Sequence, residues 1–325
     1  MNLANRLGRL IGGDTGSREL TEQEAHQLGG MVLDGGVPDF ELGALLVALR
    51  FRTPALQEWA GFHQSLAERV LRLKAPESGP RPLVMGSQSG ARDEPNLLPL
   101  LALLLARFGI PVLIHGSLHG EGRVLCAHVF RALDILPCAT LAQAQKALDG
   151  ERLAFVPTGL LAPGVAGLLS LRARLGVGNF GHVLARLINP FPGQGCRVVG
   201  VSAARVEGMR ELLLTIRAEA LLLADTEGDA FANPRRRPRI EHLREGEARV
   251  LFEAEAGSQR GLPGLPAAND AVSVAAWTRQ ALAGEVPLPM PILNQLACCL
   301  YASGYTEDMN QAKAIVAVKS VGVAA

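Results

Sequence analysis

The segment Val84-Met85-Gly86-Ser87-Gln88-Ser89-Gly90-Ala91-Arg92 joins an apolar run to a glycine-containing turn. The apolar run covers 82–85, and a strongly apolar helical segment follows at 96–108. A strand, a turn and a helix N-terminus in this order typically bind anions, because free backbone N–H groups point at the ligand. The turn has no Asp to hold a metal, and Arg92 follows it. The sequence therefore predicts a phosphate-type loop, here defined as Gly86–Gly90, with altered chemistry.

Around this loop, short apolar runs alternate with helical segments. The runs lie at 82–85, 110–114, 153–157, 197–201, 220–224 and 248–252, and the helical segments at 96–108, 121–133, 141–148 and 206–218. Such alternation predicts a mainly parallel sheet covered by helices. Residues 232–247 and 256–269 contain Pro, Gly and charge, so we expect loops there. Helices at 278–283 and 291–304 are expected to close the chain.

The N-terminal part has a purely helical pattern. Thr21-Glu22-Gln23-Glu24 is a capping box, Asp39 can cap a second helix over 40–51, and Thr53-Pro54 can begin a third. The segment 160–187 is also helical in pattern and can pack back on these helices. We therefore predict the α/β class, with a small helical domain over 1–75, joined by about 160–192, and a larger α/β domain over 76–325.

Composition limits the possible functions. The 325 residues carry a net charge of only +1, so nucleic-acid binding would depend on where charges gather. Aromatic residues make up 4%, so base stacking is not expected to dominate binding. The scattered cysteines lack a CxxC pair, and the N-terminus lacks a signal-like apolar core. These features predict a reduced cytoplasmic protein that does not enter membranes.

Four landmarks occur in a family-specific order. They are Glu41–Arg50, the phosphate-type loop, His115-Gly116, and Arg172-Ala-Arg174-Leu175-Gly176 running on to Asn189-Pro190. Together they resemble anthranilate phosphoribosyltransferase and the related nucleoside phosphorylases. The resemblance implies a small helical domain beside a larger α/β domain with a mainly parallel central sheet, and dimerisation through the helical part.

The catalytic positions of that family are largely changed. Its Gly-Thr-Gly-Gly-Asp loop is Gly86-Ser87-Gln88-Ser89-Gly90 here, its phosphate-binding Lys is replaced by Ile114, and its magnesium-binding Asp-Glu pair falls on Ala230-Phe231. Ala and Phe offer no oxygen ligands, so ordinary phosphoribosyl transfer is not expected. Asp225, Glu227 and Asp229 leave open a displaced metal site. The resemblance leaves these positions as remnants of phosphate binding: Gly86, Ser87, Ser89, Gly90, Asn96, His115 and Gly116.

The departures themselves resemble the YbiB-type branch of this fold family. They include Gly90-Ala91-Arg92, Arg123-Val124-Leu125, Thr226-Glu227-Gly228 with Ala232-Asn233-Pro234, Trp277 and Gln295-Leu-Ala-Cys298-Cys299-Leu300. The resemblance implies a homodimer that binds single-stranded DNA or RNA without strong sequence preference and lacks transferase activity. It leaves two alternatives open: a glycosyltransferase with altered substrate and metal use, and a sensor of an anionic metabolite.

Arginines are the candidate nucleic-acid contacts. The arginine cluster, defined as Arg235, Arg236, Arg237 and Arg239, could follow a phosphate backbone, or form a solvated loop paired with Asp225, Glu227 and Asp229. Further candidates, each with a structural alternative, are Arg92, Arg123, Arg172, Arg174 and His182. We expect no metal or cofactor, because Gly116 and Gly120 disfavour a helix that would pair His115 with His119.

Overall fold

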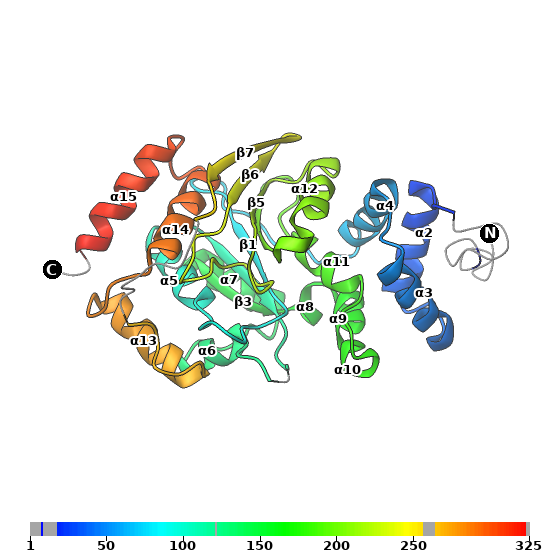
Figure 1. The fold of residues 1–325 in the computed structure, drawn as a ribbon, viewed down its shortest axis with the longest axis horizontal. Helices are drawn as coiled ribbons and strands as arrows, with labels where there is room; N and C mark the ends of the chain where they lie inside the picture. Colours follow the sequence, from blue (N-terminus) through cyan, green and yellow to red (C-terminus); the bar gives the residue numbers. More distant parts are fainter. Residues whose placement is uncertain (1–7, 9–17, 121, 256–263, 323–325) are drawn as a thin grey trace. The chain divides into compact units, whose positions relative to one another are not determined.

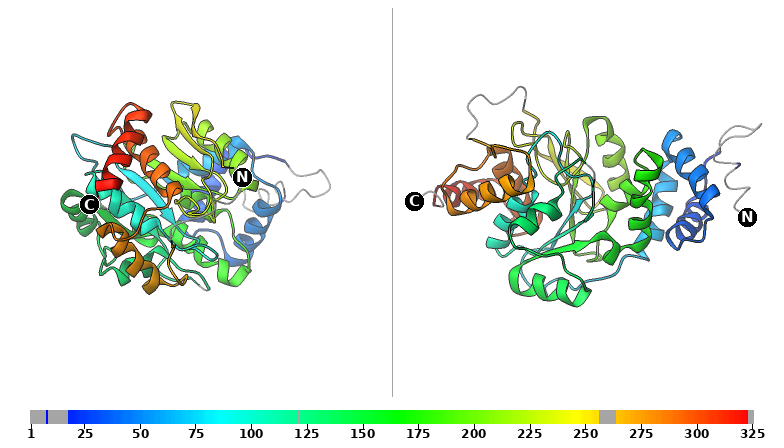
Figure 2. Two further views of the ribbon diagram at one scale, coloured as in Figure 1. Left: turned by 60° about the vertical axis from the view of Figure 1, so that its left-hand side comes forward. Right: turned by 90° about the horizontal axis from the view of Figure 1, so that it is seen from below.

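The computed structural model describes residues 8, 18–120, 122–255 and 264–322. The chain divides into two compact units. The helical unit contains Met1–Leu71 and Thr158–Asn189, and the α/β unit contains Arg72–Pro157 and Pro190–Ala325. The predicted fold class, a small helical part and a larger α/β part with a mostly parallel sheet, is confirmed (Figures 1 and 2).

The helices of the helical unit are α2 (Glu22–Leu33), α3 (Asp39–Phe51), α4 (Leu56–Ala67), α8 (Thr158–Leu161), α9 (Pro163–Ser170), α10 (Arg172–Leu175) and α11 (Gly181–Leu187). The predicted capping box at Thr21 is confirmed. Two predicted caps are wrong. Asp39 lies inside α3, after the N-cap Pro38. Helix α4 begins only after Ala55, because the Glu58 carboxylate accepts the Ala55 N–H at 2.7 Å and so caps the helix from within.

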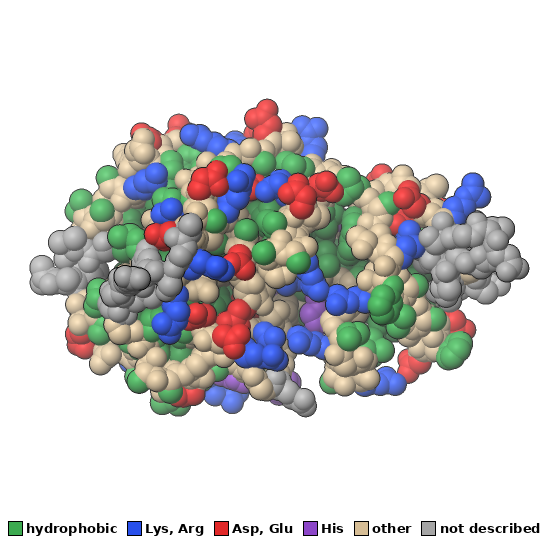
Figure 3. All heavy atoms as spheres, viewed as in Figure 1, with side chains coloured by type: hydrophobic (Ala, Val, Ile, Leu, Met, Phe, Trp, Pro, Cys, Tyr) green, Lys and Arg blue, Asp and Glu red, His purple; other side chains and the backbone are tan. Residues whose placement is uncertain are grey.

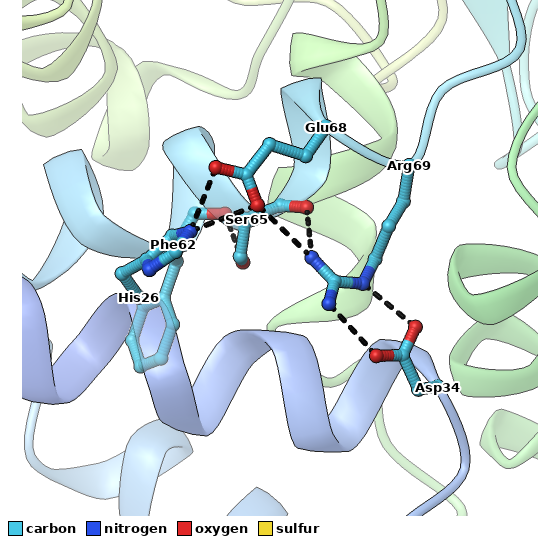
Figure 4. Close-up of polar contacts among 6 residues, drawn as sticks. All are labelled: His26, Asp34, Phe62, Ser65, Glu68 and Arg69. Carbon is cyan, nitrogen blue, oxygen red and sulfur yellow. Dashed lines mark hydrogen bonds and ion pairs between the residues drawn. The ribbon is translucent and has the colours of Figure 1, made fainter.

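Helices α2 and α4 pack with their backbones in close contact. A Cβ atom at Gly61 would lie 2.2 Å from the Glu22 carbonyl oxygen, so only glycine fits at this position. At the edge of the same pair, Arg69 donates two 2.7 Å hydrogen bonds to Asp34, and these bonds hold the pKa of Asp34 below its usual value. His26 contacts Glu68 at 3.0 Å in the same network (Figure 4). Close packing inside and ion pairs outside thus fix the two helices.

The α/β unit contains one seven-stranded sheet in the order β3-β2-β1-β4-β5-β6-β7. The strands are β1 (Leu83–Ser87), β2 (Val112–Gly116), β3 (Leu153–Pro157), β4 (Cys196–Gly200), β5 (Ala220–Leu223), β6 (Ile240–Arg244) and β7 (Glu247–Phe252). β1 to β5 pair in parallel, and β6 and β7 add an antiparallel hairpin at one edge. The six apolar runs all form strands, as predicted.

Strand β6 corrects the prediction of a loop over 232–247. Its Glu241 and His242 are almost fully buried, which an apolar pattern cannot reveal. Glu241 accepts hydrogen bonds from Arg210 at 2.6 and 2.7 Å, and His242 contacts Glu219 at 3.0 Å. These partners, distant in sequence, compensate the burial of polar side chains and allow the segment to pair with β5.

Helices cover both faces of the sheet. They are α5 (Leu98–Arg107), α6 (Cys126–Ala132), α7 (Leu141–Glu151), α12 (Val206–Thr215), α13 (Ala271–Ala283), α14 (Met290–Ala302) and α15 (Met309–Gly322). Helices α5, α13 and α14 pack together on one face, and α12 packs on the other (Figure 1). In the part of the chain that the structure describes, no helix combines the length and apolar character needed to cross a membrane.

Candidate functional site

The phosphate-type loop follows β1 at the carboxyl end of the parallel strands. Gly86 pairs with His115 and Ser87 with Gly116, so the register of β1 and β2 brings two predicted segments together. A Cβ at Gly116 would lie 2.6 Å from the Ser87 carbonyl oxygen. Gly90 ends the loop with φ +65°, a conformation that favours glycine. The sequence therefore forms the backbone of an anion-binding turn.

The carboxylate of Asp229 fills this turn. It accepts hydrogen bonds from the Ser87 hydroxyl at 2.7 Å, the Ser89 N–H at 2.9 Å and the Gly90 N–H at 3.1 Å. Asp229 is only 1% exposed. Donors of this kind would hold a phosphate group in an enzyme of this architecture. Here the protein supplies the anion from its own chain.

A second carboxylate, that of Glu227, closes the turn that follows. It accepts the N–H groups of Arg92 at 2.7 Å, Asp93 at 3.2 Å and Glu94 at 3.0 Å. Both carboxylates bind donors of the chain itself, and within the described residues Asp225, Glu227 and Asp229 do not gather into a metal-binding group. Asp225, the third acidic residue considered for that site, pairs instead with Arg236.

The residues that replace the family's acidic pair belong to the hydrophobic core. Ala230 is 1% exposed and Phe231 is 4% exposed, and both pack among buried apolar side chains. The amide of Gln295 holds this segment, accepting the Ala232 N–H at 2.7 Å and donating to the Ala230 carbonyl at 2.8 Å. The segment that carries magnesium ligands in the transferases is therefore a structural element here.

Two further predicted phosphate positions are occupied by protein contacts. Asn96 donates to the Val124 carbonyl at 2.9 Å and accepts the Leu98 N–H at 3.3 Å, so it braces the start of α5. His115 is fully buried, and its Nδ1 lies 3.1 Å from the Gln88 amide nitrogen. Burial lowers the pKa of His115 to about 4. At neutral pH this imidazole is uncharged and offers no positive charge to a phosphate.

Protonation of His115 predicts acid sensitivity. Its pKa is about 4 in the folded protein and about 6.5 in an unfolded chain, so the unfolded chain takes up the proton first. The stability that comes from keeping His115 neutral is therefore fully present above pH 6.5. As the pH falls toward 4, the free energy of unfolding decreases by up to about 3 kcal/mol. Urea unfolding from pH 7 to 4 should show a shallower decline for His115→Gln than for the wild type. The exposed-site control His119→Gln should keep the wild-type slope, and equal slopes for all three proteins would contradict the assignment.

The arginine cluster lies on the surface in contact with acidic residues. Arg235 pairs with Glu94 at 2.9 Å, Arg236 with Asp225, and Arg239 with Glu241 at 2.5 Å and Glu253 at 3.0 Å. The guanidinium of Arg237 lies 5.2 Å from the centre of the Phe252 ring. On the face drawn in Figure 3, basic side chains are interspersed with acidic ones. The sequence also allowed the cluster to be a solvated loop paired with acidic residues. The structure agrees with that interpretation in part, since Asp225 is an ion-pair partner of the cluster.

Arg92 and Arg123 have different environments beside the phosphate-type loop. Arg123 is partly buried and donates to the Gly90 carbonyl at 3.3 Å, so it braces the loop. Arg92 is exposed, and among the described residues no hydrogen bond or ion pair involves its guanidinium. Its neighbour Glu94 pairs with Arg235, so the loop and the arginine cluster lie side by side. Arg92 extends the exposed positive charge of the cluster.

Three other candidates belong to the helical unit. Arg172 and Arg174 lie in the short helix α10, and Arg174 lies 3.8 Å from Asp39, with both side chains exposed. His182 is 8% exposed, and its Nδ1 contacts the backbone of Asn179 at 3.2 and 3.3 Å. These contacts agree with a structural role for His182, the alternative to ligand contact.

Comparisons with known proteins agree with this geometry. Residues 7–70 match the helical bundle domain of the glycosyl transferase family. YbiB, an uncharacterized protein of Escherichia coli K12, is 37% identical over 306 residues, covering 93% of each chain. Anthranilate phosphoribosyltransferase of Methylocella silvestris is 24% identical over 324 residues, covering 96% of this chain and 88% of the relative.

Solved structures show the same fold. Anthranilate phosphoribosyltransferase of Thermus thermophilus superposes with a TM-score of 0.74 at 23% identity, over 100% of this chain and 96% of that one. The Saccharomyces cerevisiae enzyme, solved in complex with PRPP and Mg, gives a TM-score of 0.71 at 14% identity, over 99% and 96%. The fold and the altered loop define a phosphoribosyltransferase-like protein. Within that class, the chain belongs to the YbiB family.

Proposed function

We propose that this protein is a non-catalytic binder of single-stranded nucleic acid with low sequence specificity. The observation that carries the proposal is the filling of the phosphate-type loop by Asp229, beside exposed arginines that remain at its rim. The first part argues against phosphoribosyl transfer, and the second supplies contacts for an external phosphate backbone. The YbiB-type resemblance supports the same function.

Phosphoribosyl transfer requires a pyrophosphate group to be bound and its negative charge to be neutralised. The yeast relative was solved with PRPP and Mg. In this chain, Ala230 and Phe231 offer no metal ligands, and a diphosphate at the loop would meet the buried carboxylate of Asp229. Like charges at such short range repel strongly in a poorly solvated site. This protein therefore disfavours both the binding of a pyrophosphate group and the neutralisation of its charge.

A nucleic-acid backbone can bind at the surface without entering the loop. The side chains of Arg235, Arg236 and Arg239 are 37–52% exposed. The Arg236–Asp225 and Arg239–Glu253 pairs are solvated, whereas the partners Glu94 and Glu241 are only 14% and 2% exposed. Solvated ion pairs contribute only about 0–1 kcal/mol each, so nucleic-acid phosphates can replace the carboxylate partners. Release of counterions from the strand then favours binding in a sequence-independent way. Contacts to phosphates position a strand without reading its bases.

Fluorescence polarisation with a labelled, mixed-sequence oligonucleotide tests the proposal. We expect sub-micromolar binding at low salt that weakens steeply as salt rises, since several counterions are released. DNA and RNA of the same sequence should bind with similar affinity. A parallel assay with anthranilate, PRPP and Mg should give no product. Absence of oligonucleotide binding at low salt would overturn the proposal, and product formation would favour the transferase alternative.

We also propose that the protein forms a homodimer through helix α3. One face of this helix carries exposed apolar side chains, with Phe40 87%, Val47 47% and Phe51 85% exposed. These residues are separated by seven and four positions, so they lie along a single helical stripe. Exposed large apolar groups in such a stripe are typical of a protein–protein interface. A second copy of the chain is the partner that the YbiB-type resemblance supports.

Charge in the stripe should separate the two copies. The double variant Phe40→Glu/Phe51→Glu should be monomeric in sedimentation equilibrium at concentrations where the wild type is dimeric, because association would bury unpaired carboxylates. Leu136→Glu/Val272→Glu is the matched control, since these residues are 70% and 71% exposed in the α/β unit. The control should remain a dimer. A dimeric Phe40/Phe51 variant would place the interface elsewhere.

A further inference from the structure

We propose that Cys196, Glu219 and His242 form a binding site for a zinc-type divalent metal ion. One ligand atom from each residue, a sulfur, an oxygen and a nitrogen, lies within 4.8 Å of the other two. Thiolate, imidazole and carboxylate are the side chains that bind zinc in proteins. Three such ligands with a fourth position open to water form a common zinc arrangement.

The sheet brings these residues together from three neighbouring strands. Cys196 begins β4, Glu219 immediately precedes β5, and His242 lies in β6. The Arg197 N–H donates to the Glu219 carbonyl at 3.0 Å, and Leu221 pairs with His242. The cluster lies where β4 and β5 begin, whereas the phosphate-type loop follows the end of β1. The site is therefore separate from the phosphate-type loop.

The separation between the histidine and carboxylate ligand atoms is close to that around a bound metal. His242 Nε2 lies 3.0 Å from Glu219 Oε1. Two ligands at about 2.0–2.1 Å from a tetrahedral zinc are about 3.3 Å apart, so these atoms need to move only slightly. Cys196 is fully buried, and His242 is held by an edge-to-face contact with Tyr301 at 5.5 Å. The burial and the ring contact orient the ligands before a metal binds.

Two arginines near Glu219 set the charge of the site. Arg81 lies 3.0 Å from one carboxylate oxygen, and Arg244 lies 3.7 Å from the other. Their side chains are 37% and 50% exposed, so solvent screens their repulsion of a cation. When the metal binds, the Cys196 thiol releases its proton to solvent and the sulfur coordinates as thiolate. The thiolate then supplies a negative charge that the metal does not share with the arginines, whereas the carboxylate charge is shared between the metal and the two guanidiniums.

A surface cavity gives access to the fourth ligand position. It has a volume of about 900 Å³, and its lining includes His242, Tyr301, the acidic residues Glu245, Glu247 and Glu307, and the arginines Arg81, Arg217, Arg244 and Arg249. Water in this cavity can complete a tetrahedral site, as it does where zinc has three protein ligands. The metal would join β4, β5 and β6 through side chains as well as through backbone pairing.

Cobalt(II) provides the test, because tetrahedral cobalt–thiolate coordination has characteristic visible and near-ultraviolet bands. The full-length, tag-free protein is treated with chelator, desalted and titrated with cobalt chloride. We expect one equivalent to produce these bands and added zinc to remove them. Cys196→Ser should abolish the thiolate band, and His242→Gln should weaken cobalt binding by at least about tenfold. Cys298→Ser, a buried cysteine outside the cluster, should behave like the wild type.

Absence of the bands in the wild type at millimolar cobalt would overturn the proposal. Their persistence in Cys196→Ser would do the same, since another thiol would then be the ligand. Circular dichroism establishes whether each variant is folded. If Cys196→Ser does not fold, His242→Gln and Glu219→Gln decide, because unchanged cobalt affinity in both folded variants would exclude the site.

Discussion

Replacing Asp229 with alanine should lower the free energy of unfolding by about 3–5 kcal/mol. The substitution removes the acceptor for the Ser87 hydroxyl and for the N–H groups of Ser89 and Gly90. A buried donor left without an acceptor costs about 1–3 kcal/mol, and three donors lose their acceptor in this variant. Water that enters the vacated space can accept some of these hydrogen bonds and so reduce the total loss. Urea unfolding measures the loss directly. Asp93→Ala, in the adjacent turn and exposed, should change stability by less than about 0.5 kcal/mol.

The same variant should regain stability from added anions. With the carboxylate gone, the donors of the phosphate-type loop can bind inorganic phosphate or sulfate. An anion at 100 times its dissociation constant would stabilise the folded variant by about 2.7 kcal/mol. The wild type and Asp93→Ala should show only the general effect of salt. Equal responses to phosphate in all three proteins would mean that Asp229 does not occupy an anion site.

Changing all four residues of the arginine cluster to alanine should produce the largest loss of nucleic-acid affinity. If each guanidinium neutralises one phosphate of a single strand, the slope of log affinity against log salt should fall by about 3, and low-salt affinity by about 100-fold. The fold should tolerate the change because Arg210 still pairs with the buried Glu241. Fluorescence polarisation over a salt series measures both quantities.

A matched variant separates local contacts from a general loss of charge. Arg131, Arg152, Arg205 and Arg279 also belong to the α/β unit, and their replacement by alanine removes the same total charge. This control should keep most of the salt slope. If both quadruple variants lose affinity equally, the arginine cluster is not a specific contact surface and only overall charge matters.

The elements that sequence patterns predict well are those with local causes. The Thr21 capping box needs only residues within one helical turn, and the six strands follow from short apolar runs. The cap assigned to Thr53 was wrong because Glu58, a turn further on, caps α4 instead. Strand β6 was missed because Arg210 and Glu219, distant in sequence, compensate its buried Glu241 and His242.

At the candidate site, too, the sequence did not reveal contacts between residues that are distant along the chain. Sequence comparison with the transferases identified the positions of the loop and the loss of the acidic pair. It did not reveal that Asp229 is buried in the loop, or that Glu227 binds the next turn. The available signal was the alternation of Asp225, Glu227 and Asp229, for which the sequence left a displaced metal site open as an alternative. Distinguishing a metal ligand from an internal anion required the positions of the N–H donors.

The hairpin at the edge of the sheet also affects how molecules meet. Among the strands that the structure describes, β7 pairs only with β6, so one side of its backbone has no strand partner there. Open edges of this kind can recruit strands from other molecules and begin aggregation. Glu247 and Arg249 are exposed on β7, and the neighbouring Arg244 and Glu245 add charge. A foreign strand would have to desolvate these groups, so the charges protect the edge against fibre-like growth.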